Sequence, residues 1–204
     1  MEIKKGDFIE LEFTGKIDNA NGEIFDTTNS EIAKKLGYKR EVKPIRIIVG
    51  EGMIIDGLDK ALEGKEIGKQ YSIEIMPNEA FGERKRELIK IVPANAFKDK
   101  SLLREGNTLV IDGFLARIVK VGSGRVLLDL NHPLAGKKLY YEFKILKKIE
   151  NEEEKLKVIL EYFGIKDYKI EKKDGKLILK IKKLDKTIEA LIKKYIKIEI
   201  TNLE

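Results

Sequence analysis

The sequence predicts an α+β fold in which an antiparallel sheet wraps on one short helix. A small β-rich insert and a C-terminal αββαβ segment are expected in addition. Several segments alternate apolar and polar residues, which is typical of strands with one buried face. One short segment within residues 53–62 instead repeats apolar residues at three and four positions, which is typical of a helix. Glycine, proline and asparagine turn signals separate these segments.

The chain is organised around the stretch Val49–Gly68, which reads as a strand end, a tight turn, a short helix and a glycine stop. Gly50 and Gly52 permit a turn that a Cβ would obstruct. Ile55 and Leu58 then begin an apolar helical face. A helix this short is not stable alone, because nucleation costs more than a few hydrogen bonds return. We therefore expect it to lie against the sheet, with an apolar floor where the chain enters the helix.

Other segments supply the sheet around this helix. The alternating segments are residues 7–17, 23–28, 44–49, 70–76 and 137–149. Between the second and third of these, Ser30 is expected to cap a short helix that runs through Leu36 and ends at Gly37. Pro77 to Gly82 forms a loop that presents a phenylalanine.

Residues 84–131 have the pattern of a separate insert. The strand candidates are Leu88–Val92, Thr108–Ile111, Phe114–Val121 and Val126–Leu130, with hairpin turns at Asp112-Gly113 and Gly122-Ser123-Gly124 and a helical turn at Pro93–Phe97. A segment of this length can form only a small core, and we therefore expect some of its apolar surface to remain exposed. Such surface is commonly an interaction site.

Residues 151–204 form a third unit of order αββαβ. The first helix has an apolar stripe of Leu156, Ile159, Leu160 and Phe163, and the second, capped by Asp185, has a stripe of Ile188, Leu191 and Ile192. Asp174-Gly175 joins two strands, 168–173 and 176–182, and residues 196–200 form the last strand. The expected domains are therefore 1–83 with 132–150, 84–131, and 151–204. A homodimer through 151–204 is expected, because small cores often need further burial.

Composition excludes several classes of site. The chain has no cysteine and one histidine, His132, which excludes disulfides, thiolate metal sites and multi-histidine metal centres within one chain. No apolar run reaches membrane-spanning length, and the N-terminus lacks the apolar core of a secretory signal, so we expect a cytoplasmic protein without membrane attachment. The net charge is +6, and 10 basic against 5 acidic residues fall in 84–131. We interpret this excess mainly as a solvated surface, with nucleic-acid binding as the weaker alternative.

The residues expected around the floor are almost all apolar. They are Phe13, Phe25, Asp26, Ile45, Ile54, Ile55, Leu58, Phe81 and Tyr141. They include no nucleophile–base pair, metal cluster or phosphate-binding glycine loop, so no metal or cofactor is expected. An apolar socket with few polar groups suits an apolar ligand such as a proline ring. The alternative is that the aromatic residues are simply core.

Five motifs in order carry a resemblance to a known family. They are F-T-G-K-I-D, I-F-D-T, V-G-E-G-M-I-I-D-G-L-D-K-A-L-E-G, N-E-A-F-G and N-H-P-L-A-G-K-K-L-Y-Y-E-F. The chain resembles the FKBP-type peptidyl-prolyl cis-trans isomerases, and within them the SlyD-like branch, in which an insert-in-flap chaperone domain interrupts the FKBP domain. Its C-terminal unit resembles that of the long-chain archaeal members. The resemblance covers residues 1–150 by motif and 151–204 by architecture alone.

The resemblance implies a peptidyl-prolyl isomerase and folding chaperone that acts without a cofactor on unfolded or nascent chains containing X-Pro bonds. It implies catalytic positions at Asp26, Ile55, Phe25, Phe81 and Tyr141, and substrate-binding positions at Phe13, Ile45, Ile54 and Leu58. Three positions depart from the family pattern: Phe13 and Phe81 replace tyrosines, and Leu58 replaces a tryptophan. A holdase with a catalytically silent pocket and a nucleic-acid adaptor using the basic insert remain as alternatives.

Overall fold

The structure is a computed structural model that describes residues 1–111, 113–173 and 176–202. These residues divide into two compact units, one of residues 1–75 with 139–204 and the other of residues 76–138. The C-terminal segment thus belongs with the predicted isomerase segment, and the finer division into three domains stays a prediction. In the part of the chain that is described, none of the helices combines the length and apolar character needed to cross a bilayer.

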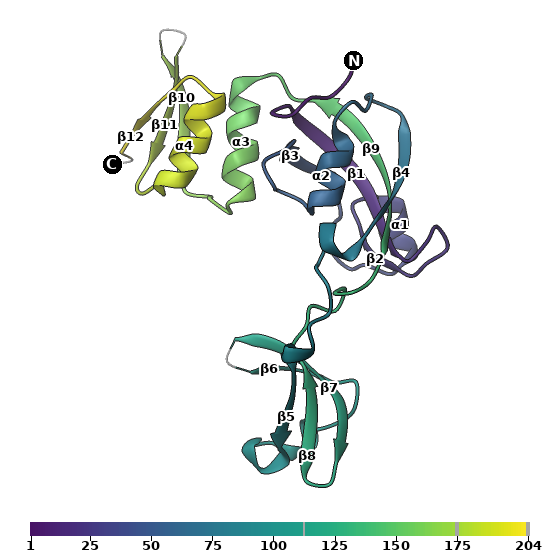
Figure 1. Ribbon diagram of the computed structural model, residues 1–204. Helices are drawn as coiled ribbons and strands as arrows, with labels where there is room; N and C mark the ends of the chain where they lie inside the picture. The colour runs from purple at the N-terminus through teal and green to yellow at the C-terminus, as the bar shows by residue number, and fades with distance from the viewer. Residues whose placement is uncertain (112, 174–175, 203–204) are drawn as a thin grey trace. The chain divides into compact units, whose positions relative to one another are not determined.

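The first unit is built on an antiparallel sheet, as the alternation predicted. Its strands are β1 (Phe8–Ile17), β2 (Ile24–Thr27), β3 (Ile45–Ile48), β4 (Gln70–Ile75) and β9 (Leu139–Lys148). Their order is β2-β1-β9-β4, and β3 also pairs with β1. The expected face of β9 is confirmed, because its alternate residues from Leu139 to Ile145 are all buried. Figure 1 shows this sheet curving beside the short helix α2 (Asp56–Leu62).

The short helix α1 (Ser30–Lys35) follows β2, but its cap differs from the prediction. The side-chain oxygen of Asn29, not Ser30, accepts hydrogen bonds from the amides of Glu31 and Ile32, each at 3.0 Å. Asn29 and Ser30 are adjacent and both are good caps. The register is fixed by the end of β2, where Thr27 and Thr28 bond to Phe13 of β1.

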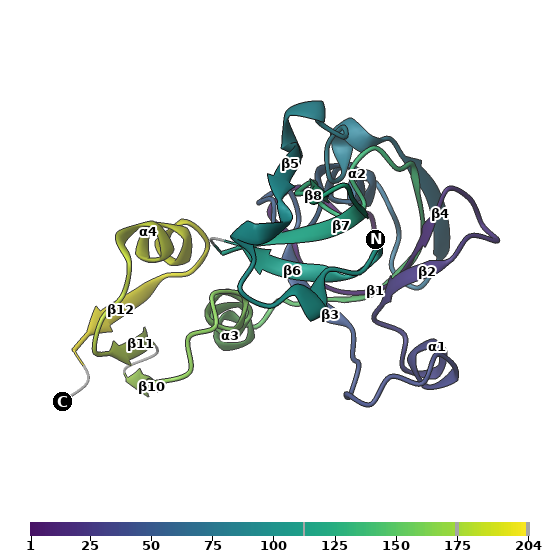
Figure 2. The ribbon, with the colours of Figure 1, turned by 90° about the horizontal axis from the view of Figure 1, so that it is seen from below.

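The C-terminal segment has the predicted element order. It contains α3 (Glu152–Tyr162), β10 (Tyr168–Lys173), β11 (Lys176–Ile181), α4 (Lys186–Tyr195) and β12 (Ile198–Thr201). The strands are ordered β10-β11-β12, with β11 and β12 parallel, and α4 lies over one face of the sheet (Figure 2). The Asp185 cap is confirmed, but Phe163 lies at the end of α3 and is 41% exposed, so its place in the buried stripe was wrong. The turn predicted at Asp174-Gly175 lies outside the described residues.

Helices α3 and α4 pack on the N-terminal part of the same unit, at β1, β3 and the turn after β3. The ring of Tyr195 in α4 meets the ring of Phe8 edge-on at 5.4 Å between centroids. Its hydroxyl donates a 2.7 Å hydrogen bond to Glu51, which also receives one from Lys194. Arg46 of β3 pairs with Glu161 of α3. The C-terminal segment is therefore attached close to the turn that precedes α2.

The second unit contains a four-stranded antiparallel sheet. Its strands are β5 (Ile89–Pro93), β6 (Thr108–Ile111), β7 (Phe114–Gly122) and β8 (Arg125–Asp129), in the order β5-β8-β7-β6. Short 3-10 turns at Pro77–Glu79, Arg86–Leu88, Ala94–Ala96 and Lys100–Leu102 connect them. The core is small, as predicted: Ile118, Val126 and Leu128 are buried and pack against partly buried neighbours such as Phe97. Asp112 of the predicted β6–β7 turn lies outside the described residues, whereas Ser123 and Gly124 make the β7–β8 turn with positive φ.

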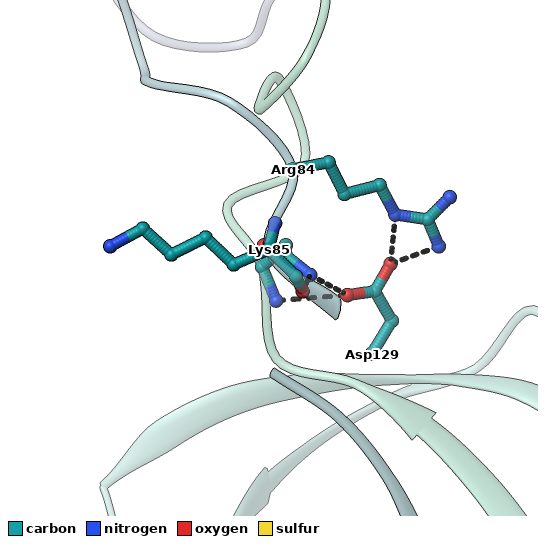
Figure 3. Close-up of polar contacts among 4 residues, drawn as sticks. Arg84, Lys85 and Asp129 are labelled. Carbon is teal, nitrogen blue, oxygen red and sulfur yellow. Dashed lines mark hydrogen bonds and ion pairs between the residues drawn. The ribbon is translucent and has the colours of Figure 1, made fainter. Parts of the chain in front are cut away.

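A polar clamp joins the two chain segments where they enter this sheet (Figure 3). Arg84 donates to Asp129 through Nε at 3.1 Å and Nη2 at 2.6 Å. The side chain of Asn131 bonds both the amide and the carbonyl of Lys85, and also reaches Asp129 at 2.7 Å. Burial tends to raise the pKa of Asp129, but the hydrogen bonds from Asn131 and Arg84 outweigh it and hold the pKa below its usual value.

Candidate active site

The turn before α2 is held in place by a buried carboxylate. Asp59, in the first turns of α2, is only 5% exposed. It accepts hydrogen bonds from the amides of Gly50 at 2.8 Å and Gly52 at 3.0 Å. Both glycines have positive φ, 80° and 66°, which explains why these positions are glycine. These two hydrogen bonds to Asp59 fix the path of the chain from the turn into Met53 and Ile54. The sequence pattern alone did not identify Asp59. An acidic residue between Leu58 and Leu62 of the apolar helical face, after two glycines, was the available signal.

The predicted floor follows directly from this turn. Leu58 is 1% exposed and Met53 is 9% exposed, so both are core. Ile54 and Ile55 are half-buried, and Ile55 is the N-cap residue of α2. The carbonyl of Ile55 accepts the first helical hydrogen bonds from the amides of Leu58 and Asp59, both at 3.0 Å. The chain thus enters α2 with Ile54 and Ile55 partly accessible above a buried Leu58.

Three predicted aromatic residues meet on the strands β1, β2 and β9. The ring of Tyr141 lies 5.6 Å from that of Phe13 and 5.8 Å from that of Phe25, between centroids, and the second pair is edge-on. Tyr141 is 4% and Phe13 is 8% exposed, whereas Phe25 is half-buried. Edge-to-face contacts of this kind stabilise a defined ring orientation in addition to burying apolar surface. The structure therefore brings these three residues together as one aromatic wall.

Gly15 makes this wall possible. It pairs with Tyr141 on one side and with Asp26 on the other. A Cβ built at Gly15 would lie 2.6 Å from Cζ of Phe25, a separation that side chains do not reach. The Phe25 ring therefore occupies the space above the glycine. Sequence analysis quoted the F-T-G motif but gave Gly15 no role.

Asp26 is half-buried beside this wall, and its side chain accepts a 2.9 Å hydrogen bond from the amide of Thr27. Burial first, and then the negative charge of Asp26, raise the pKa of the Tyr141 hydroxyl above its ordinary value. The phenol is protonated at neutral pH already at its ordinary pKa, so the shift only extends the pH range over which this hydroxyl can donate a hydrogen bond. A threonine pair, Thr14 and Thr27, joins β1 to β2 through hydroxyls 2.8 Å apart. These bonds keep Asp26 and Phe25 in register with β1.

Two further predicted site residues belong to other segments of the chain. Ile45 lies at the start of β3, opposite Leu11 of β1, and is half-buried. Phe81 belongs to the second compact unit, where its ring stacks on that of His132 at 4.3 Å. Among the described residues, no group of three or more histidine, aspartate or glutamate side chains is arranged to hold a metal ion.

Comparison with known proteins agrees with the motifs. The family model for the FKBP-type peptidyl-prolyl cis-trans isomerase matches residues 1–112. The chain is 37% identical over 147 residues to the short-type peptidyl-prolyl cis-trans isomerase of Methanocaldococcus jannaschii, covering 70% of this chain and 92% of that protein. It is 33% identical over 158 residues to the isomerase SlyD of Helicobacter pylori (76% of this chain, 78% of that one). It is 30% identical over 149 residues to SlyD of Treponema pallidum (71% and 77%). The chain therefore belongs to the family of FKBP-type peptidyl-prolyl cis-trans isomerases.

Proposed function

We propose that this isomerase works through an apolar pocket walled by Phe13, Phe25 and Tyr141, and that residues 84–131 form an insert-in-flap chaperone domain that binds unfolded chains. The observation that carries the pocket is the meeting of the three rings on β1, β2 and β9, with Asp26 next to Phe25 in the chain. The half-buried Ile54 and Ile55 are the proposed floor. Ile45 and Leu58 complete the proposed site within the first unit, and a role for Phe81 stays a prediction from the family resemblance.

The chemistry of the bond suits such a pocket. Amide resonance makes the planar peptide bond dipolar and sets a rotation barrier of about 18–20 kcal/mol. X-Pro bonds populate both isomers but exchange in about tens to hundreds of seconds without catalysis. The twisted transition state has lost resonance and is less dipolar than the planar form. An apolar wall favours the twisted form relative to the planar one, which is catalysis by differential binding.

The polar groups of the site have positioning roles in this proposal. The Tyr141 hydroxyl is the proposed hydrogen-bond donor of the aromatic wall, and burial and then the charge of Asp26 raise its pKa. The backbone amide of Ile55, at the start of α2, is the proposed donor to the substrate carbonyl. Asp26 accepts a hydrogen bond from the Thr27 amide and so orients the peptide dipole at the end of β2.

A protease-coupled assay on a short proline peptide tests the pocket. We expect Asp26→Ala to lower kcat/KM about tenfold, the effect of an interaction worth about 1.4 kcal/mol in the transition state. Tyr141→Phe should also lower it. Tyr140→Phe is the matched control, because Tyr140 is the next residue of β9 and its side chain lies on the opposite face. Equal rates for Tyr141→Phe and Tyr140→Phe would remove the hydroxyl from the proposal.

The chaperone part rests on apolar surface of the second unit. Ile91, Val110 and Leu115 are 66%, 71% and 60% exposed. Exposed aliphatic residues on one face of a small sheet are commonly part of a protein-binding surface. An insert that holds an unfolded chain raises the effective concentration of X-Pro bonds at the pocket.

Replacement of residues 84–131 by a short loop tests this division of labour. We expect catalysis of proline-limited refolding to fall sharply, while isomerisation of a short peptide persists. Equal loss on both substrates would reject it. A homodimer through 151–204 is a separate part of the proposal, and a monomeric mass in solution at all concentrations would contradict it.

A further inference from the structure

The sheet of the second unit covers only one of its faces with its own core. Along β8, Val126 and Leu128 are buried in that core, so Leu127 and Asp129 point to the opposite face. We name this opposite side the open face and define it by three cross-strand pairs. These pairs are Ile91 with Leu127, Arg117 with Asp129, and Leu115 with Val110.

The three pairs follow one another as rows across the sheet. Leu127 and Asp129 are two residues apart on β8, and Arg117 and Leu115 are two residues apart on β7. Strands rise roughly 3.3 Å per residue, so neighbouring rows are about 7 Å apart. An apolar row thus lies on each side of a central charged row. This spacing equals that of alternate side chains on an extended peptide.

Each apolar row borders a cavity. One cavity of about 600 Å³ is lined by Leu115 of an apolar row and by both residues of the charged row, Arg117 and Asp129, with Arg84 and Lys137 also at its wall. A second, of about 280 Å³, is lined by Ile91 and Leu127 with Lys120 and Arg125. The open face therefore offers two places for side chains, and both have basic residues at their edges.

The central row, taken together with Arg84, has a net positive charge. Asp129 already accepts hydrogen bonds from Arg84 and Asn131, which offset its charge. Arg117 is exposed and makes no ion pair with another described residue. A surface with this imbalance attracts an acidic group. The rows beside it are aliphatic, whereas binding of single-stranded nucleic acid uses aromatic side chains on which bases stack. Protein is therefore the better occupant.

We propose that the open face selects extended segments in which an acidic residue stands between two apolar residues, in the order apolar-x-acidic-x-apolar. The carboxylate pairs with Arg117, and the two apolar side chains enter the cavities beside Leu115 and Leu127. This inference rests on the proposed chaperone function and names the class of segment that the insert takes.

Fluorescence anisotropy with the full chain and short labelled peptides tests the selection. The peptides have the form Leu-Ser-X-Ser-Leu with X as Asp, Asn or Lys. We expect the Asp peptide to bind about fivefold tighter than the Asn peptide, the difference that a partly screened ion pair supplies. In Arg117→Gln this difference should vanish while affinity for the Asn peptide stays the same, which also shows that the face remains intact. Arg104→Gln is the matched control, because Arg104 is an exposed arginine of the same unit outside the open face.

A charge reversal makes the test sharper. Arg117→Glu should prefer the Lys peptide over the Asp peptide. Equal binding of the Asp and Asn peptides to the native chain overturns the selection but leaves the chaperone proposal standing. Absence of binding to all three peptides, together with unchanged refolding after replacement of 84–131, overturns the chaperone proposal itself. Binding of a single-stranded RNA probe that is lost in Arg117→Gln would assign the face to nucleic acid instead.

Discussion

Substitution of Gly15 by alanine should disable the pocket by moving one ring. The new Cβ would lie 2.6 Å from Cζ of Phe25, and 3.0 Å from two further ring atoms. Carbon atoms pack best at about 3.5–4.0 Å, so the ring must move by about 1 Å. A displacement of that size at a catalytic site costs up to about a hundredfold in rate. We expect kcat/KM on a short proline peptide to fall about tenfold to a hundredfold.

The fold should survive this change. Extra volume in a packed site costs typically about 1–3 kcal/mol, and alanine itself fits an extended strand. The double variant Gly15→Ala/Phe25→Ala isolates the cause, because residues that act through one contact are not additive. In the Phe25→Ala background, the alanine at position 15 should have little further effect. Loss of 1.36 kcal/mol of transition-state stabilisation lowers the rate about tenfold. A folded Gly15→Ala protein whose kcat/KM stays within about twofold of the native value would therefore refute the role given to Phe25.

Two further predictions concern the turn before α2. Asp59→Ala leaves the amides of Gly50 and Gly52 without their acceptor. We expect the free energy of unfolding, measured in urea, to fall by about 2–4 kcal/mol. An unchanged urea midpoint would contradict the stabilising role of Asp59. The hydrogen bonds from Lys194 and then Tyr195 lower the pKa of Glu51 below 4.5. A lowered folded-state pKa gives stability that is present above the unfolded value and is lost as pH falls through the folded value. The melting temperature of the native chain should therefore exceed that of Glu51→Gln at neutral pH, and this difference should shrink as the pH falls below 4.5. A difference that does not change with pH would show that the carboxylate charge is not involved.

The sequence by itself determined the elements and the family. Alternation located the strands of the three described sheets to within a residue or two, because a strand with one buried face must repeat with period two. Glycines at 50 and 52 with the apolar repeat after them located α2, and Asp185 located the start of α4. Five motifs in order indicated the family, and the family model that matches residues 1–112 agrees.

Only the tertiary structure decided which distant residues meet. The contact of Phe25 with Gly15, the acceptor role of Asp59 and the docking of Tyr195 on Glu51 join residues on different elements, and no local pattern encodes such pairs. The choice of Asn29 over Ser30 as cap, and the exposure of Phe163, depended on where neighbouring elements end. The parallel pairing of β11 with β12 and the open face of the insert likewise follow from packing. The physical reason is that local propensity sets the type of an element, whereas burial of its surface depends on which elements it meets.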